Sequence, residues 1–255
     1  MCRGLVTMSA VAVIPARYAS SRFPGKPLAR ATGKYLIQHV YERVAQARGI
    51  DRVIVATDDE RIGEAVGTFG AECFFTSPDH PSGTDRVAEV ARQLKCDFVV
   101  NVQGDEPEIE PAAVEILLGT LGDSAHPMAT LACSFANLRR QGIEADPSDP
   151  NRVKVVCVGG RALYFSRSLI PYPRNDASGF GGPYLHLGTY AYRRDFLLTL
   201  AELPPTQLER IEGLEQLRAI EHGYGIAVGS VERAAAGIDT PEDYAAFVAR
   251  FRSAG

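Results

Sequence analysis

Short apolar runs alternate along the first half of the chain with stretches in which apolar residues recur every three or four positions. The run at 11–14 predicts a buried strand. The next apolar residues fall on one face of a predicted helix that stops before Gly49, namely Leu36, Ile37, Val40 and Val44. Three more strands are predicted in RVIVATDDE (52–60), AECFFT (71–76) and DFVVNVQGDEP (97–107). Each is followed by a predicted helix, with apolar stripes at Ile62, Val66 and Phe69, then at Val87, Val90, Ala91 and Leu94, then from Pro111 to about Leu121.

Continuous apolar strands separated by helices predict a parallel sheet that is covered on both faces, which is a Rossmann-like arrangement. Ligands of such sheets collect beyond the carboxyl ends of the strands. Three polar clusters follow strands in this way: the loop from Arg17 onward, 57–59 and 103–106. We therefore expect a ligand site at this edge of the sheet.

The second half of the chain is more mixed. Strands are predicted in MATLACSF (128–135), VKVVCV (153–158), RALYFSRS (161–168) and GIAVGSVE (225–232), and a helix over 207–222. The Gly/Pro-rich segment 171–184 reads as a loop. The fold class expected from this pattern is α/β, with a mostly parallel central sheet and a smaller mixed lobe. We expect one domain over 1–255, with parts at about 11–127, 128–235 and 236–255, the last a helix that returns to the active site.

Composition narrows the function classes. A net charge of −4 argues against a protein that coats nucleic acid. The five cysteines form no CxxC pair, so neither a disulfide framework nor a zinc knuckle is indicated, and a cytoplasmic location fits best. No segment approaches the roughly 20 apolar residues of a membrane span. A cleaved signal peptide is not favoured, since cleavage would remove the first predicted strand.

A loop with local positive charge follows the first strand. Arg17, Arg22 and Lys26 occur there with no acidic residue among them. Cationic side chains and backbone N–H groups at the end of a strand suit a polyphosphate. The loop is not a Walker motif, because Ser20 and Pro27 stand where that motif needs Gly and Ser or Thr, and the chain has no GxGxxG fingerprint.

Two aspartates are candidate ligands for the Mg²⁺ that accompanies a polyphosphate in the cell. Asp105 follows a predicted strand, and Gly104 before it would allow the turn to approach a ligand closely. In GIDTPED, helix initiation accounts for Thr240, Pro241 and Asp243 but gives Asp239 no such role. We therefore expect Asp105 and Asp239 to be the metal ligands, for one Mg²⁺ or two.

The order of motifs resembles that of CMP-Kdo synthetases, the 3-deoxy-manno-octulosonate cytidylyltransferases. The resemblance extends from about residue 11 to 251 and rests on IPARYASSRFPGKPL, VIVATDD, SGTDR, NVQGDEP, ALYFSR…IP, HLGTYAYR, LEQLRAIEHG and GIDTPED. NVQGDEP, HLGTYAYR and LEQLR are the most specific of these. The resemblance implies a nucleotidyltransferase fold and a cytoplasmic homodimer that makes CMP-Kdo from CTP and Kdo, with Mg²⁺ as cofactor, for lipopolysaccharide biosynthesis.

The resemblance also implies roles for individual residues. Catalytic roles fall to Arg17, Lys26, Asp105 and Asp239, the last two as metal ligands. Nucleotide contacts fall to Ala16, Arg17, Arg22, Lys26, Ser82, Gly83, Thr84, Arg86, Gln103 and Asp105. The sugar-acid pocket would be lined by Gln103, Arg167, His186, Tyr190, Glu215 and Gln216.

Three alternatives stay open at this point. The acceptor could be a related sugar acid such as 8-amino-Kdo or a sialic-acid-like compound, because Thr189, Ala191 and the segment 171–184 depart from the family pattern. Another nucleoside triphosphate could replace CTP, since only the resemblance distinguishes the base. A non-catalytic nucleotide-binding protein would be expected to lack one of the two aspartates or Lys26, and all three are present.

Overall fold

The computed structural model describes residues 8–20, 22–143, 145–174, 182–235 and 237–254, so part of the predicted loop 171–184 lies outside it. The chain forms two compact units. The first unit comprises Met1–Ala112, Arg193–Leu198 and Ala235–Gly255, and the second comprises Ala113–Tyr192 and Thr199–Ala234. The division into one domain with three parts stays a prediction. Within the described residues, no helix has the length and apolar character needed to cross a bilayer.

The first unit contains four parallel strands in the order β3-β2-β1-β4. They are β1 (Ala10–Ala16), β2 (Arg52–Thr57), β3 (Glu72–Phe75) and β4 (Phe98–Asn101). These elements confirm the strands predicted from the first half of the chain. Ala12, Val13 and Ile14 have no exposed surface, as expected for a central strand with helices on both faces.

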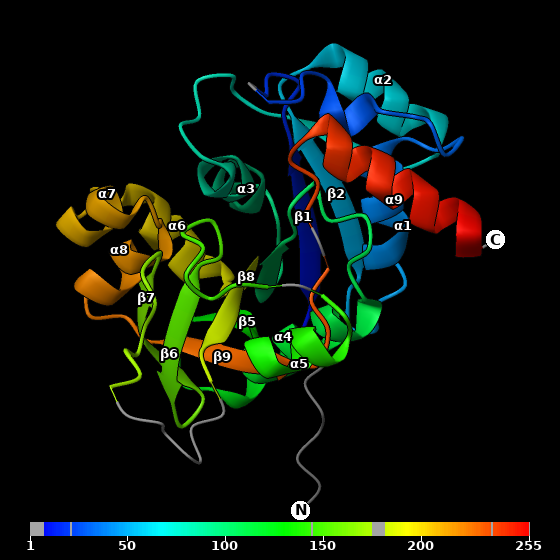
Figure 1. Ribbon diagram of the computed structural model, residues 1–255. Helices are drawn as coiled ribbons and strands as arrows, with labels where there is room; N and C mark the ends of the chain where they lie inside the picture. Colours follow the sequence, from blue (N-terminus) through cyan, green and yellow to red (C-terminus); the bar gives the residue numbers. More distant parts are fainter. Residues whose placement is uncertain (1–7, 21, 144, 175–181, 236, 255) are drawn as a thin grey trace, which may run out of the picture. The chain divides into compact units, whose positions relative to one another are not determined.

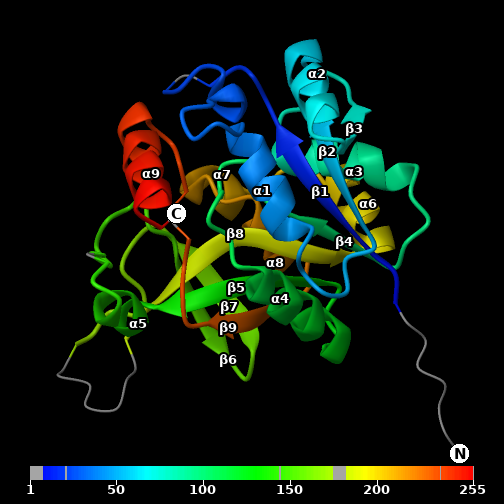
Figure 2. The same cartoon turned by 90° about the vertical axis from the view of Figure 1, so that its right-hand side faces the viewer.

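Three helices connect these strands: α1 (Leu36–Val44), α2 (Glu60–Thr68) and α3 (Gly83–Arg92). The crossovers from β1 to β2 and from β2 to β3 run in one direction along the sheet, and the crossover from β3 to β4 runs back. Because such crossovers are right-handed, α1 and α2 cover one face of the strands and α3 the other (Figure 2). Asp59 and Ser82 begin α2 and α3 as N-caps whose side chains accept backbone N–H bonds.

The C-terminal helix α9 (Pro241–Ala254) lies beside α1 (Figure 1). Phe247 and Val248 pack against Leu36 and Ile238 in a small apolar cluster. The predicted start of this helix is confirmed: Thr240 Oγ1 accepts from the backbone N–H of Asp243, and the Asp243 carboxylate accepts from the N–H of Thr240. The packing of α9 on α1 places the segment 237–240 within the first unit.

The second unit contains a mixed sheet in the order β8-β5-β9-β7-β6. Its strands are β5 (Met128–Ser134), β6 (Lys154–Val158), β7 (Arg161–Ser166), β8 (Tyr184–Arg193) and β9 (Ile226–Val231). β5 and β9 are parallel, whereas β5–β8, β6–β7, β6–β8 and β7–β9 are antiparallel. The predicted strands are present. The long strand β8 was not among the predicted elements.

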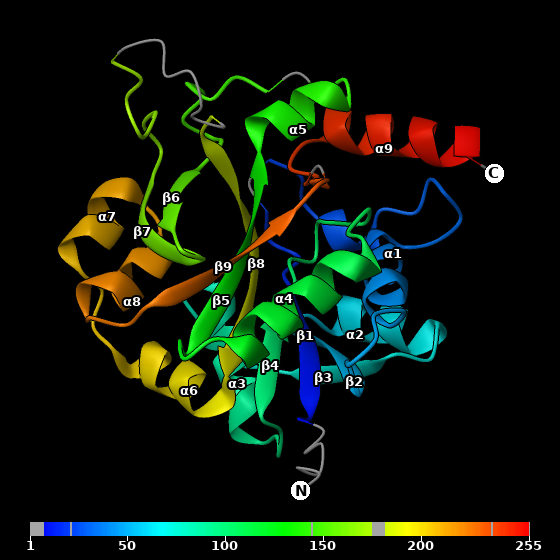
Figure 3. The same cartoon turned by 90° about the horizontal axis from the view of Figure 1, so that it is seen from below.

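Four helices lie wholly or almost wholly in this unit: α4 (Pro111–Asp123), α5 (Phe135–Arg140), α7 (Gln207–Glu212) and α8 (Gln216–Glu221). A fifth, α6 (Arg194–Glu202), continues from the first unit into the second. Figure 3 shows α4 next to β9, and a Cβ atom on Gly229 of β9 would meet Thr120 of α4 at 2.6 Å.

The prediction of one helix over 207–222 is wrong. Gly213 adopts φ 62°, a left-handed conformation that ends α7, and α8 starts three residues later. The break changes the direction of the apolar stripe, so that Leu214 and Leu217 are buried while Ile211 is exposed. Glycine adopts positive φ without steric cost. The turn at Gly213 therefore ends the helix although the apolar spacing over 207–222 fits a continuous one.

Candidate active site

The loop after β1 folds back so that Lys26 points inward. Gly25 adopts φ 71° and starts the 3-10 turn η1 (Lys26–Leu28), and its N–H donates to the carbonyl of Tyr18 at 2.9 Å. A Cβ atom at Gly25 would lie 3.2 Å from the Tyr18 ring. As a result the Lys26 side chain is only 13% exposed, although it belongs to a surface loop.

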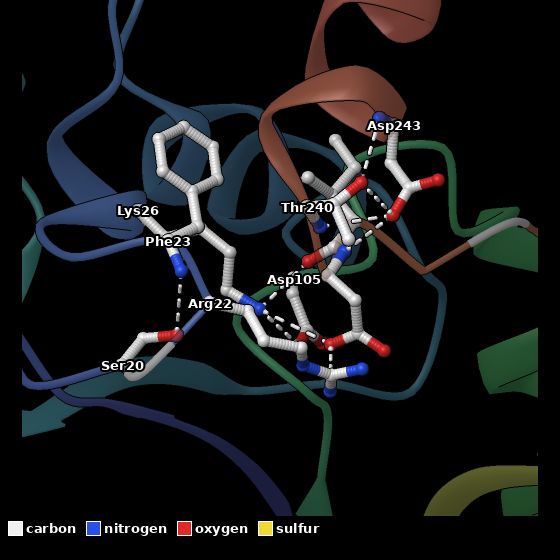
Figure 4. A network of polar contacts seen from close by, with 9 residues as sticks. Ser20, Arg22, Phe23, Lys26, Asp105, Thr240 and Asp243 are labelled. Atoms are coloured by element: carbon white, nitrogen blue, oxygen red, sulfur yellow. Dashed lines mark hydrogen bonds and ion pairs between the residues drawn. The ribbon is translucent and has the colours of Figure 1, made fainter.

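The Lys26 ammonium joins three chain segments of the first unit. Its Nζ donates to Asp105 Oδ2 at 2.7 Å and to the backbone carbonyl of Ile238 at 2.6 Å, and lies 3.7 Å from Asp239 Oδ1 (Figure 4). The two candidate metal ligands, 134 positions apart in the sequence, therefore face the same nitrogen atom. The structure brings Lys26, Asp105 and Asp239 together as one cluster.

The backbone next to Asp105 packs closely against neighbouring segments. A Cβ atom on Gly104 would lie 2.9 Å from the carbonyl oxygen of Pro15 and 3.2 Å from Ile37. The absence of a side chain at Gly104 thus allows close contact with the end of β1, and the predicted close approach to a ligand stays a prediction. The backbone N–H of Ile238 donates to the carbonyl of Asp105 at 2.9 Å, which attaches the segment that carries Asp239.

Arg22 extends the cluster toward solvent. One of its guanidinium nitrogens lies 3.1 Å from Asp239 Oδ1, with the two side chains 64% and 52% exposed. The backbone N–H of Asp239 donates to Asp243 at 3.1 Å. Burial opposes the charged form of Asp243, but the N–H donors of Asp239 and Thr240 outweigh it and lower the pKa of this carboxyl. The first helical turn of α9 therefore holds Asp239 in place.

The remaining residues expected at the nucleotide site lie at the ends of β1 and β4 and at the start of α3. Ala16 is the buried last residue of β1, and Gln103 is partly buried just after β4. Arg17 donates to the carbonyl of His80 at 2.7 Å, two residues before the N-cap Ser82. Gly83 and the buried Thr84 open α3. The contact from Arg17 thus connects the basic loop to the segment that starts α3.

Arg86 differs from the other cations because it has no exposed surface. Its guanidinium lies 3.0 Å from Asp58 Oδ1 and donates to Thr76 Oγ1, and burial lowers its pKa. Asp58 is the partner that sequence reasoning missed, although it belongs to one of the predicted polar clusters. In this structure Arg86 supports the carboxyl ends of β2 and β3 from inside, and a nucleotide contact for it stays a prediction.

In the second unit, a β-bulge brings His186 and Tyr190 together. Tyr190 pairs with Thr130 of β5, but Leu187 already pairs with Leu131, so the two residues between them in β8 are extra. Four residues of regular strand would separate His186 from Tyr190 by about 13 Å. Their ring centroids are 5.5 Å apart. Gly188 within a strand pattern is the signal that could have predicted the bulge.

Both rings occupy an apolar setting. His186 packs edge-on against Phe165 with centroids 4.9 Å apart, and burial lowers its pKa to about 3. Burial, together with the nearby Tyr192 and Glu215, raises the pKa of Tyr190. Both side chains are therefore neutral at physiological pH, and they can bind a ligand through hydrogen bonds but not as ions.

Gln216 carries an orphaned donor. The residue is 5% exposed, and its Nε2 has no hydrogen-bond partner among the described residues. A buried amide without a partner costs free energy, and native proteins almost always satisfy such groups. Glu215 immediately precedes it at the N-cap of α8 and acts electrostatically on Tyr190. The start of α8 can thus offer a hydrogen-bond donor to a polar ligand.

Arg167 is occupied by backbone partners. Its guanidinium donates to the carbonyls of Glu212 at 2.7 Å, Pro150 at 3.1 Å and Gly213 at 3.4 Å. Glu212, which sequence reasoning missed, also accepts from the Arg167 backbone N–H and from Ser166. These contacts make Arg167 a brace for the break between α7 and α8. A sugar-acid contact for it stays a prediction.

The carboxylates of Asp105 and Asp239 suit a magnesium ion. Mg²⁺ binds oxygen ligands, commonly one or two carboxylates plus phosphate oxygens and water. The two side chains approach one cationic atom, Lys26 Nζ, which shows that a positive charge is accommodated between them. Among the residues that the structure describes, no group of three or more His, Cys, Asp or Glu gathers as a complete protein cage. The two carboxylates fit a metal ion whose remaining ligands are supplied by the substrate.

Comparisons with known proteins agree with this chemistry. A family model described as "Cytidylyltransferase" matches residues 11–228. The 3-deoxy-manno-octulosonate cytidylyltransferase of Syntrophotalea carbinolica is 53% identical over 254 residues, covering 96% of this chain and 99% of that protein. The enzyme of the same name from Syntrophobacter fumaroxidans is 52% identical, covering 94% and 96%.

A solved structure of CMP:2-keto-3-deoxy-manno-octonic acid synthetase complexed with CTP matches with a TM-score of 0.89 and 45% identity, covering 97% of this chain and 100% of that one. The family match extends over most of the chain, and the relatives are aligned along nearly their whole length. This chain therefore belongs to the cytidylyltransferase family.

Proposed function

We propose that this protein transfers the cytidylyl group of CTP to 3-deoxy-manno-octulosonate (Kdo), forming CMP-Kdo and pyrophosphate for lipopolysaccharide biosynthesis. The observation that carries the proposal is the meeting of Lys26, Asp105 and Asp239 at one point of the first unit. A triphosphate needs cationic side chains, and its metal needs carboxylates, and this cluster supplies both. The names of relatives about half identical to this chain support Kdo as the acceptor.

The reaction is an in-line displacement at the α-phosphorus. The 2-hydroxyl oxygen of Kdo forms the new bond to phosphorus, the bond to the pyrophosphate oxygen breaks, and the hydroxyl proton is released. The protein does little covalent chemistry in such transfers, so positioning and charge stabilisation dominate catalysis. Lys26 would neutralise the charge that develops on the phosphates, and Arg17 and Arg22 would bind the triphosphate from the same loop.

Asp105 and Asp239 would hold the metal ion. A bound Mg²⁺ supplies Lewis-acid polarisation of the α-phosphate and orients the nucleophile. In the structure the Lys26 ammonium lies between these carboxylates. Binding of the nucleotide would give Lys26 phosphate oxygens as new partners, which would free the carboxylates for the ion.

The second unit would bind the sugar acid. Gln216 presents a buried N–H donor without a partner, which suits a carboxylate or hydroxyl oxygen. His186 and Tyr190 add two neutral polar groups on an apolar background. A sugar acid combines apolar ring faces with hydroxyl and carboxylate groups. The buried donor and the two neutral polar side chains match these groups.

A pyrophosphate-release assay tests the proposal. Purified protein with CTP, Kdo and MgCl₂ should release pyrophosphate, whereas UTP or ATP in place of CTP should give much less. A panel of other 2-keto sugar acids, including 8-amino-Kdo and a sialic acid, tests the acceptor. Equal rates with every nucleotide, or no release with Kdo while another acid reacts, would reject this substrate pair.

Asp105→Asn tests the metal assignment in the same assay. The substitution keeps the size of the side chain but removes the charge, so turnover should be abolished with the fold intact. Asp97→Asn is the matched control, because Asp97 accepts hydrogen bonds from Ser9 at an exposed position outside the cluster. Near-normal activity of Asp105→Asn would remove Asp105 from the metal site.

We also propose that the protein acts in the cytoplasm as a homodimer, supported by its family membership. Light scattering on the purified protein should give a mass of about twice the 27.6 kDa of one chain. A single-chain mass at micromolar concentration would contradict the dimer.

A further inference from the structure

The side-chain hydroxyl of Thr130 lies beside the bulge in β8. Its Oγ1 is 3.0 Å from the carbonyl oxygen of Leu187, 3.0 Å from that of Thr189 and 3.1 Å from Nε2 of His186. The extra residues of the bulge interrupt the regular ladder of backbone hydrogen bonds. Thr130, which has no exposed surface, is thus in contact with two carbonyls of the bulge and with one imidazole nitrogen.

The chemistry of these partners determines the direction of each hydrogen bond. A threonine hydroxyl has one hydrogen to donate and two lone pairs. Carbonyl oxygens only accept, so the hydroxyl hydrogen is directed to Leu187 or Thr189. Toward His186, the Thr130 oxygen must then be the acceptor. Nε2 of His186 therefore carries a hydrogen.

In a neutral imidazole, a hydrogen on Nε2 leaves Nδ1 with a lone pair. The apolar surroundings, which include the Phe165 ring, favour the neutral form. Nδ1 makes no hydrogen bond to any of the described residues. His186 as a whole residue is partly exposed.

We propose that Thr130 is a positioning residue that holds His186 as the Nε2–H tautomer, so that Nδ1 accepts a hydrogen bond from a substrate hydroxyl. The inference deepens the proposed function and rests on it for the identity of the ligand. A neutral acceptor nitrogen repels a carboxylate and binds an O–H donor. Nδ1 therefore receives a hydroxyl of the sugar acid, and the acid's carboxylate requires donors such as the orphaned Nε2 of Gln216.

The first test needs no substrate. ¹⁵N NMR of the imidazole rings distinguishes a nitrogen that bears a hydrogen from one with a lone pair. The His186 signals can be assigned by their absence from a His186→Gln variant. In the free protein at pH 7.5, Nε2 should be the protonated nitrogen and Nδ1 the unprotonated one. The opposite pattern, or a mixture of the two tautomers, would overturn the inference whatever the enzyme's substrates are.

The second test uses a pair of variants at Thr130. Thr130→Val keeps the shape but removes the hydroxyl, and Thr130→Ser restores it. Thr130→Val should shift the His186 signals away from the single tautomer and raise the KM for Kdo about fivefold, the scale of one net hydrogen bond. The KM for CTP and kcat should change little. Thr130→Ser should behave as the unaltered protein in both measurements.

A control variant shows whether the effects of Thr130→Val are specific to this hydroxyl or follow the loss of any hydroxyl in the second unit. Thr120→Val is the control, because it removes a hydroxyl from α4 of the same unit, where Thr120 donates to the carbonyl of Ile116. It should leave the His186 signals and the KM for Kdo unchanged. Unchanged His186 signals in a folded Thr130→Val protein would overturn the positioning role. Shifted signals with an unchanged KM for Kdo would overturn the assignment of Nδ1 to the sugar acid.

Discussion

Nζ of Lys26 lies 2.7 Å from Oδ2 of Asp105, in a pair whose lysine side chain is largely withdrawn from solvent. We expect Lys26→Ala to lower kcat/KM for pyrophosphate release about 10²-fold or more, because one preorganised charge-stabilising donor is lost. Lys34→Ala is the control, since Lys34 forms an ion pair with Glu42 at 2.6 Å on a more exposed part of the same unit. Full activity of Lys26→Ala would reduce the basic loop to a surface feature.

A substitution at Arg22 distinguishes a role in binding CTP from a role in stabilising the fold. Its ion pair with Asp239 is solvent-exposed, and such pairs contribute about 0–1 kcal/mol. Arg22→Ala should therefore leave the urea midpoint almost unchanged while raising the KM for CTP. The matched control is Arg52→Ala, which breaks a similarly exposed pair with Glu72. An equal KM for CTP in both variants would show that Arg22 does not contact the triphosphate.

Gly104 should tolerate no side chain. A Cβ atom there would meet the Pro15 carbonyl at 2.9 Å, so the backbone that carries Asp105 would have to shift. We expect Gly104→Ala to lower the free energy of unfolding by about 1–3 kcal/mol and to reduce activity.

Gly67→Ala is the control for Gly104→Ala, because a Cβ atom at that position of α2 meets nothing within 4 Å. Alanine is the better helix former, so this variant should be as stable as the unaltered protein or up to about 1 kcal/mol more stable. Urea unfolding measures both effects. Equal stability of the two variants would contradict the close contact at Gly104.

His186 should make stability depend on pH in the acidic range. Its pKa is lowered from 6.5 to about 3 by burial, so between these values the unfolded chain binds a proton that the folded chain does not. The contribution of neutral His186 is present above pH 6.5 and is lost as the pH falls toward 3. Urea unfolding at pH 7.5, 6, 5 and 4 should show a smaller loss of stability for His186→Gln than for the unaltered protein. Parallel curves would indicate that His186 titrates normally in the folded state.

Much of the first unit follows from local sequence pattern. Each apolar run of the first half became a strand of the parallel sheet, and Thr240 with Asp243 began the C-terminal helix as predicted. Such features depend on neighbouring residues alone, through alternation of burial and through capping hydrogen bonds. The same locality explains the failure at 207–222, where the apolar spacing continues through Gly213 although the backbone turns.

The sequence by itself determined which chemical groups are available: three cations after the first strand, a carboxylate after the fourth and another before the last helix. Only the tertiary structure decided their partners. Lys26 meets the carbonyl of Ile238 across 212 positions because α9 packs on α1, and His186 meets Tyr190 because two extra residues shift the register of β8. Contacts of this kind arise from the packing of whole elements, which no local spacing encodes.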